Sequence, residues 1–162
     1  MNLRRTIRER EEGILLLELI MAITILTMGI LGFLTAFHAS LKAGQELGTR
    51  DQAQASFESV VETLNAADFS TLYSTYEAAT FPVNGLVDSY GSPAVIRVDF
   101  HVNETTMPSE FGPIGDIDGD GAMGTVDAST SYVILPTRLT LTYEMTHGTE
   151  TKEMFLVLGS GW

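Results

Sequence analysis

The sequence predicts an α+β chain in which a long N-terminal helix, first transmembrane and then amphipathic, precedes a small antiparallel β-sheet domain. Three observations predict this: an apolar run over residues 14–37, apolar residues at helical spacing over residues 57–64, and alternating apolar and polar residues after residue 94. The expected divisions are a leader over residues 1–13, a transmembrane helix over 14–37, an amphipathic continuation over 38–68 and a β domain over 69–162.

The apolar run is long enough to cross a membrane. At about 1.5 Å per residue, residues 14–37 form a helix of roughly 36 Å, and a hydrocarbon core is about 30 Å thick. The leader carries four arginines and three glutamates, whereas the first 30 residues after Phe37 contain only Lys42 and Arg50 as cations. By the positive-inside bias, we expect a single pass of the inner membrane with a cytoplasmic N-terminus and an extracytoplasmic C-terminal domain.

Glu18 is the one charged residue inside the apolar run. A carboxylate at that depth costs on the order of 2.5–3.5 kcal/mol in lipid by insertion scales. A plain single-pass anchor explains the length and the charge asymmetry but leaves Glu18 unexplained. A secretory signal peptide has a shorter apolar region of about 7–15 residues, and residues 36–40 contain the only small-residue cleavage site that would suit one.

The leader ends in Gly13, which is followed by Ile14, Leu15 and a leucine-rich run that contains Glu18. This arrangement resembles the class III signal of type IV prepilins and type II secretion pseudopilins. The similarity extends to Gly32 and is greatest to PilV-type minor pilins and I-type minor pseudopilins. The usual first mature residue in those families is phenylalanine and the second is often threonine, where this chain has Ile14 and Leu15.

The resemblance implies a set of roles for the N-terminal residues. Prepilin peptidase would cut between Gly13 and Ile14, the new N-terminus at Ile14 would be methylated, and Glu18 would be the retained acid that serves assembly. The chain would then be a structural minor subunit of a type IV pilus or type II secretion pseudopilus, polymerised through its N-terminal helix into a filament or at the cell surface. Its implied partners are the peptidase, other pilin or pseudopilin subunits and the inner-membrane assembly platform. The alternative is a non-polymerising, membrane-anchored extracytoplasmic binding module.

Beyond the membrane segment, Phe57, Val60, Val61 and Leu64 predict an apolar helix face that packs on a sheet, with the helix ending near residues 65–68. Residues 73–90 predict a loop with at most one short strand. The alternating segments predict strands over residues 94–102, 132–135, 138–145 and 152–158. Residues 147–150 predict the turn of a hairpin between the last two strands.

Composition and spacing argue against several functions. Removal of the leader takes the net charge from −12 to −13, so the exported part would repel nucleic acid, and no direct nucleic-acid partner is expected. The sequence contains no cysteine, which excludes disulfides and thiol chemistry. His38, His101 and His147 are expected at a membrane edge, on a strand face and in a turn, and none has a second ligand at metal spacing. No catalytic arrangement emerges, and we expect that the chain is not an enzyme.

Residues 116–127 carry a calcium-type motif. Acids at its positions 1, 3, 5 and 12 and glycine at position 6 match the loop of EF-hand proteins, with aspartate in place of the usual glutamate at position 12. Flanking helices are not expected, because Pro108 and Pro113 precede the loop and a strand follows it. The alternative is an acidic, glycine-rich turn without metal. The predicted Ca²⁺ ligands are Asp116, Asp118, Asp120, the carbonyl of Ala122, and Asp127.

Overall fold

A computed structural model describes residues 3–112 and 115–159, with side chains from Leu16 onward. It contains two compact units, Met1–Gln45 and Glu46–Trp162, which are treated separately below. Helix α1 (Leu3–Ala66) contributes to both. The helix is continuous, and it ends at Ala66, within the predicted range of residues 65–68; Gly44 and Gly48 do not interrupt it.

The first unit is the apolar part of α1. Its large apolar side chains between Leu16 and Phe37 are 45–69% exposed. Among the described residues, one helix is long and apolar enough to cross a membrane, with a mean hydropathy of 2.2. Three threonines in this segment donate their hydroxyls to carbonyls one turn earlier, over 2.6–2.8 Å, so they add no unpaired polar group: Thr24, Thr27 and Thr35.

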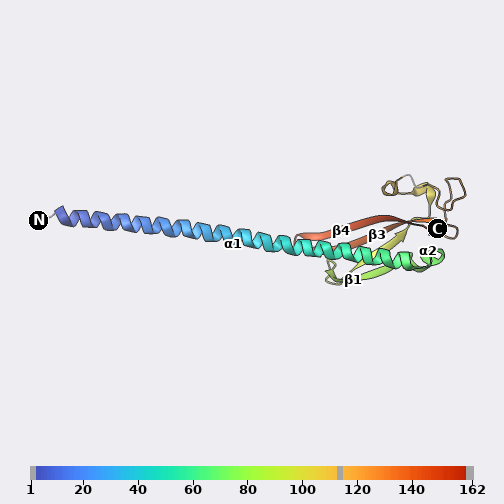
Figure 1. The fold of residues 1–162 in the computed structure, drawn as a ribbon, viewed down its shortest axis with the longest axis horizontal. Coiled ribbons are helices and arrows are strands. Elements are labelled where there is room, and N and C mark those ends of the chain that lie inside the picture. Colours follow the sequence, from blue (N-terminus) through green and yellow to red (C-terminus); the bar gives the residue numbers. More distant parts are fainter. Residues whose placement is uncertain (1–2, 113–114, 160–162) are drawn as a thin grey trace. The chain divides into compact units, whose positions relative to one another are not determined.

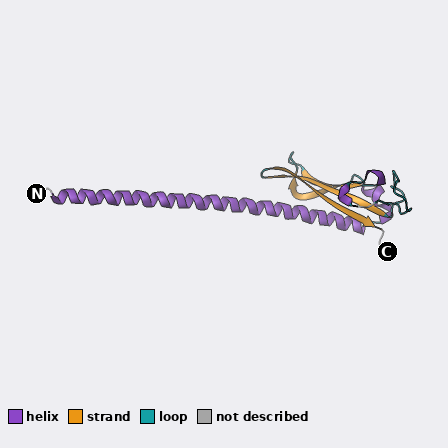
Figure 2. Ribbon diagram, turned by 90° about the horizontal axis from the view of Figure 1, so that it is seen from above, coloured by secondary structure: helices purple, strands orange, loops and turns teal. Residues whose placement is uncertain are grey.

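In the second unit, α1 is amphipathic and packs on a sheet. Ala53, Phe57, Val60 and Leu64 are 0–5% exposed and follow each other at spacings of three or four residues. The predicted stripe is thus confirmed with one change: Ala53 belongs to it, whereas Val61 is only half-buried. Figure 2 shows the strands along one side of this part of α1, and in Figure 1 the helix passes across them, between β1 and β4.

The segment after α1 contains more structure than the sequence predicts. Asp68 caps a 3₁₀ turn, η1 (Phe69–Thr71), by accepting the N–H of Ser70 over 3.0 Å, and helix α2 (Leu72–Tyr76) follows. Strand β1 (Thr80–Val87) then runs through Pro82 and Gly85, within the segment expected to be a loop with at most one short strand. Proline is tolerated there because β1 is an edge strand, and its pairing with the next strand shifts between Pro82 and Val87.

The sheet is an antiparallel meander in the order β1-β2-β3-β4. Strand β2 (Pro93–Phe100) buries alternate residues from Ala94 to Phe100, which confirms the strand predicted over residues 94–102 apart from its last two residues. Strand β4 (Gly148–Gly159) pairs along its whole length with β3 (Ile134–Met145). The hairpin prediction is confirmed, but its turn is formed by residues 146–147, because Met145 and Gly148 already pair.

The separate strands predicted over residues 132–135 and 138–145 are wrong: β3 is a single strand that contains Pro136. The ladder between β2 and β3 ends at the pair Phe100 and Thr137. Pro136 lies just beyond this end, and its carbonyl accepts the N–H of His101 over 2.9 Å. Its missing N–H therefore interrupts no ladder bond, and the strand continues past the proline.

Residues 101–133, which connect β2 to β3, form an excursion at one end of the sheet. It contains two 3₁₀ turns, η2 (Glu104–Thr106) and η3 (Ser109–Phe111). Phe111, Ile117 and Ala128 are buried within it, separately from the main cluster between α1 and the sheet. In Figure 2 the short helical turns lie at the end of the strands.

We expect Leu64→Ala to destabilise the second unit by about 2–5 kcal/mol, because it removes a fully buried side chain from the contact between α1 and the sheet. Urea unfolding of the full chain in detergent micelles measures this change. Glu62→Ala, at an exposed position two residues earlier, is the matched control and should change stability little. Equal destabilisation by both variants would contradict the proposed packing.

Candidate metal centre

The excursion over residues 101–133 is the part of the domain with the richest polar chemistry. A connection of this length without regular structure is unusual in a compact domain, and such loops are commonly functional. Backbone hydrogen bonds close the excursion on itself and join it to the sheet: Ala128 N–H donates to the Val102 carbonyl over 2.9 Å within the excursion, and Ile134 N–H of β3 donates to the Ile117 carbonyl over 3.3 Å. The predicted calcium loop lies within this excursion.

Glu104 is the central side chain of the excursion. Asn103 accepts the N–H of Thr105 over 2.9 Å and so starts η2 with Glu104 as its first residue. The Glu104 side chain then points inward, and the residue is only 9% exposed. One of its carboxylate oxygens accepts the N–H of Ile117 over 2.6 Å, and the other accepts the N–H groups of Gly124 and Thr125, both over 2.8 Å.

These hydrogen bonds keep Glu104 ionised. The N–H of Gly124 contributes most to lowering its pKa, and the N–H of Ile117 comes next; together with Thr125 and Asp118 they outweigh the opposing effect of burial. Glu104 is thus a buried carboxylate that joins the two sides of the loop, residues 117–118 and 124–125. Its hydrogen bonds satisfy much of what it loses by leaving water.

Two aspartates of the motif accept hydrogen bonds from other residues of the loop. Asp116 accepts the N–H of Gly119 over 2.7 Å and that of Gly121 over 3.0 Å. Both glycines have positive φ, +74° and +85°, which side chains disfavour, so the glycine expected at motif position 6 is needed for the turn. Asp118 accepts the hydroxyl of Thr125 over 3.0 Å.

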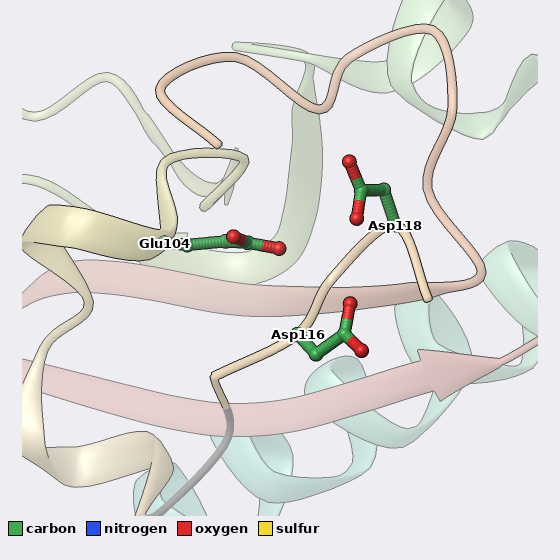
Figure 3. A group of neighbouring side chains, drawn as sticks. All are labelled: Glu104, Asp116 and Asp118. Atoms are coloured by element: carbon green, nitrogen blue, oxygen red, sulfur yellow. The ribbon is translucent and has the colours of Figure 1, made fainter. Parts of the chain in front are cut away.

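The three acids converge. Glu104, Asp116 and Asp118 each offer a carboxylate oxygen, and these three oxygens lie within 4.8 Å of one another. Figure 3 shows Glu104 approaching from η2 and the two aspartates from the loop opposite. The group could hold a metal ion. Its donors are all oxygen, which suits hard cations such as Ca²⁺ and Mg²⁺, and three carboxylates so close together repel one another unless a cation compensates them.

The remaining predicted ligands have other contacts. The carboxylate of Asp120 accepts the N–H of Ala122 over 2.7 Å, and that of Asp127 accepts the N–H of Ser129 over 3.0 Å. The contact with Ser129 also lowers the pKa of Asp127. The structure therefore brings together Asp116 and Asp118 of the predicted set, and not Asp120 or Asp127. It adds Glu104, which sequence reasoning missed because no ligand spacing links residue 104 to the motif.

The predicted processing and assembly residues lie in α1. Gly13 and Ile14 have helical backbone, and their side chains lie outside the described part of the chain. The Glu18 side chain is exposed on the apolar helix. Comparisons with protein-family models, curated proteins and solved structures found no match. The functional argument consequently rests on the sequence and on this geometry.

Glu104→Gln should loosen the excursion and lower the melting temperature. The side-chain amide carries an NH₂ group, and either orientation turns that group toward a backbone N–H that now donates to the carboxylate. Thermal melting and hydrogen exchange of Gly124 and Thr125 measure the effect. Glu110→Gln, an exposed acid in the same excursion, is the control.

The same carboxylate predicts a pH dependence. Because the pKa of folded Glu104 lies below its ordinary value of 4.5, its contribution to stability is complete above about pH 4.5 and is lost as the pH falls further. When the pH is lowered below about 4.5, the melting temperature of Glu104→Gln should therefore fall less than that of the wild type. Equal melting temperatures of the variant and the wild type at neutral pH would contradict the assigned role.

Proposed function

We propose that the chain is a structural minor subunit of a type IV pilus or type II secretion pseudopilus, cleaved after Gly13 and polymerised through α1. The observation that carries the proposal is Glu18, one acid in a helix segment whose large apolar side chains are all at least 45% exposed in the described chain. Such a surface needs a cover of lipid or of other helices.

Lipid and neighbouring helices differ in the partners that they provide for the Glu18 carboxylate. Lipid gives the carboxylate no partner, at a cost of about 2.5–3.5 kcal/mol. In a bundle of identical or related helices, cleavage after Gly13 would create a positive amine at Ile14, four residues before Glu18. A neighbouring helix displaced by about 6 Å along the axis would bring its amine beside this carboxylate, since a helix rises about 1.5 Å per residue. A bundle thus explains an acid that an isolated anchor does not.

The layout of the exported part supports the same proposal. A helix whose second half packs on a small antiparallel sheet is the α+β arrangement expected of a pilin-like subunit. The alternative function is a membrane-anchored binding module that keeps its leader and does not polymerise. The state of the mature N-terminus distinguishes the two.

The proposal includes a calcium ion in the excursion. Asp116 and Asp118 would contribute side-chain oxygens, as the motif predicts, and Glu104 is placed to join them. Asp120, the Ala122 carbonyl and Asp127 would complete the set predicted from the sequence, which requires Asp120 and Asp127 to exchange their present hydrogen bonds. The ion would offset the repulsion among the acids and link metal binding to stability.

Mass spectrometry of the mature chain should find an N-methylated Ile14 at its N-terminus, and Gly13→Ala should accumulate with its leader attached. Glu18→Ala should be cleaved normally but enter filaments poorly. Breaking a buried ion pair costs about 3–5 kcal/mol, so incorporation should fall by two orders of magnitude or more.

The readout is the amount of the chain in sheared filaments relative to the membrane fraction. Glu62→Ala, which removes an exposed acid from the same helix, controls for the loss of charge and should assemble normally. An intact Met1 on the mature chain, together with normal membrane insertion, would favour the anchored module. Normal incorporation of Glu18→Ala would remove the role given to that residue.

Calcium should raise the melting temperature of the full chain in micelles, and Asp118→Ala should abolish the shift. Because aspartate at motif position 12 is one methylene shorter than glutamate, we expect a Kd in the weak range of roughly 10⁻⁴–10⁻³ M, with little competition from magnesium. Glu110→Gln should retain the full shift. A melting temperature that does not differ between calcium and chelator would identify the segment as an acidic turn without metal.

A further inference from the structure

His101 lies where the excursion leaves the sheet, one residue after β2 ends. The sequence placed it on a strand face, whereas the structure makes it the half-buried first residue of the excursion. Its ring contacts Phe111 of η3 in an edge-to-face arrangement, with ring centroids 5.1 Å apart. Phe111 in turn contacts Phe155 of β4 in the same manner, at 5.3 Å. The three rings fasten η3 to the sheet.

The imidazole of His101 has a nitrogen atom without a hydrogen-bond partner, and it lies in the field of a cation. Its Nε2 atom is inaccessible to solvent and has no hydrogen-bond partner within the described chain, and the same holds for Nε of Arg138 on β3. The positive charge of Arg138 lowers the pKa of the His101 ring. A proton added at Nε2 would therefore be buried without a hydrogen bond to stabilise it, and the positive charge of Arg138 would oppose it.

The carboxylates near the His101 ring already have other partners. Asp99 of β2 binds Arg97 at 2.8 Å and Arg138 at 3.7 Å. Glu77, at the end of α2, accepts the N–H of Phe100 over 2.9 Å. On η3, Glu110 is exposed and accepts the hydroxyl of Ser109, whereas β4 contributes the apolar ring of Phe155.

The balance of these groups favours the neutral ring. Burial contributes most to lowering the pKa of His101 below its ordinary value of 6.5, Arg138 adds to the effect, and the attraction of Asp99 and Glu77 is smaller. The unfolded chain therefore takes up the proton at a higher pH than the folded chain does. Stability from this site is complete above about pH 6.5 and falls as the pH decreases below that value.

We propose that His101 is a pH-sensitive fastener of the excursion: the neutral ring holds η3 on the sheet, and protonation beside Arg138 releases it. Glu104 lies three residues further along the excursion, so mild acid would loosen the segment that contains the three converging acids. This inference depends on neither the pilus proposal nor the calcium proposal.

NMR of the full chain in detergent micelles tests the proposal without a variant. The titration midpoint of His101 should lie below its ordinary value of 6.5. The Phe111 ring and the Gly124 amide should change with the midpoint of His101. A His101 midpoint at or above 6.5, or excursion signals that do not follow the titration of His101, would overturn the proposal.

Two variants test the cause. His101→Gln removes the titration, so the fall in melting temperature between about pH 7.5 and 5.5 should be smaller than in the wild type. Arg138→Gln removes the neighbouring cation and should raise the midpoint of His101. A full fall in His101→Gln, or an unchanged midpoint in Arg138→Gln, would count against the fastener.

Discussion

The second unit depends on the burial of one face of α1 against one face of a four-stranded sheet. Among the residues that the structure describes, no second layer of regular structure covers the sheet, and the sequence contains no cysteine to cross-link it. Ala53, Phe57, Val60 and Leu64 provide the helix side of the core, and Ile96, Val98, Leu139, Leu141 and Tyr143 are fully buried on the sheet side. Everything else in the unit is attached to this two-layer core.

The edges of the sheet carry features that oppose pairing with other chains. On β1, Pro82 removes a donor, the register shifts, and the Gln52 side chain donates to the carbonyl of Asn84. On β4, Lys152 pairs with the buried Leu141 and so places a charge on the core-facing side of an edge strand. A polymer of this chain would accordingly form through α1, and not through the sheet, which agrees with the proposed function.

The sequence predicted correctly those elements whose buried face follows a regular spacing of apolar residues along the chain. The alternation in β2 and the helical spacing from Phe57 to Leu64 both identified the buried face, because each period follows from backbone geometry alone. The sequence allowed one short strand over residues 73–90 without placing β1, and it divided β3 in two. Pro82 is tolerated because β1 is an edge strand, and Pro136 because it lies just beyond the end of the ladder with β2, and neither position is visible in the local pattern. Glu104 escaped prediction for a related reason: its partners at residues 117, 124 and 125 are distant in sequence, and only the folded excursion brings them to it.

The meander has a consequence for the order of folding. The β3–β4 hairpin closes over two residues, whereas the pairing of β2 with β3 must close the whole of residues 101–133. Loop closure costs about 0.6 kcal/mol for each doubling of length, so we expect the hairpin to form first and the excursion to dock late. Contacts that form after the transition state act on the unfolding rate more than on the folding rate. Whatever orders the excursion would therefore extend the lifetime of the folded domain without speeding its formation, a distinction that the two arms of a chevron plot measure.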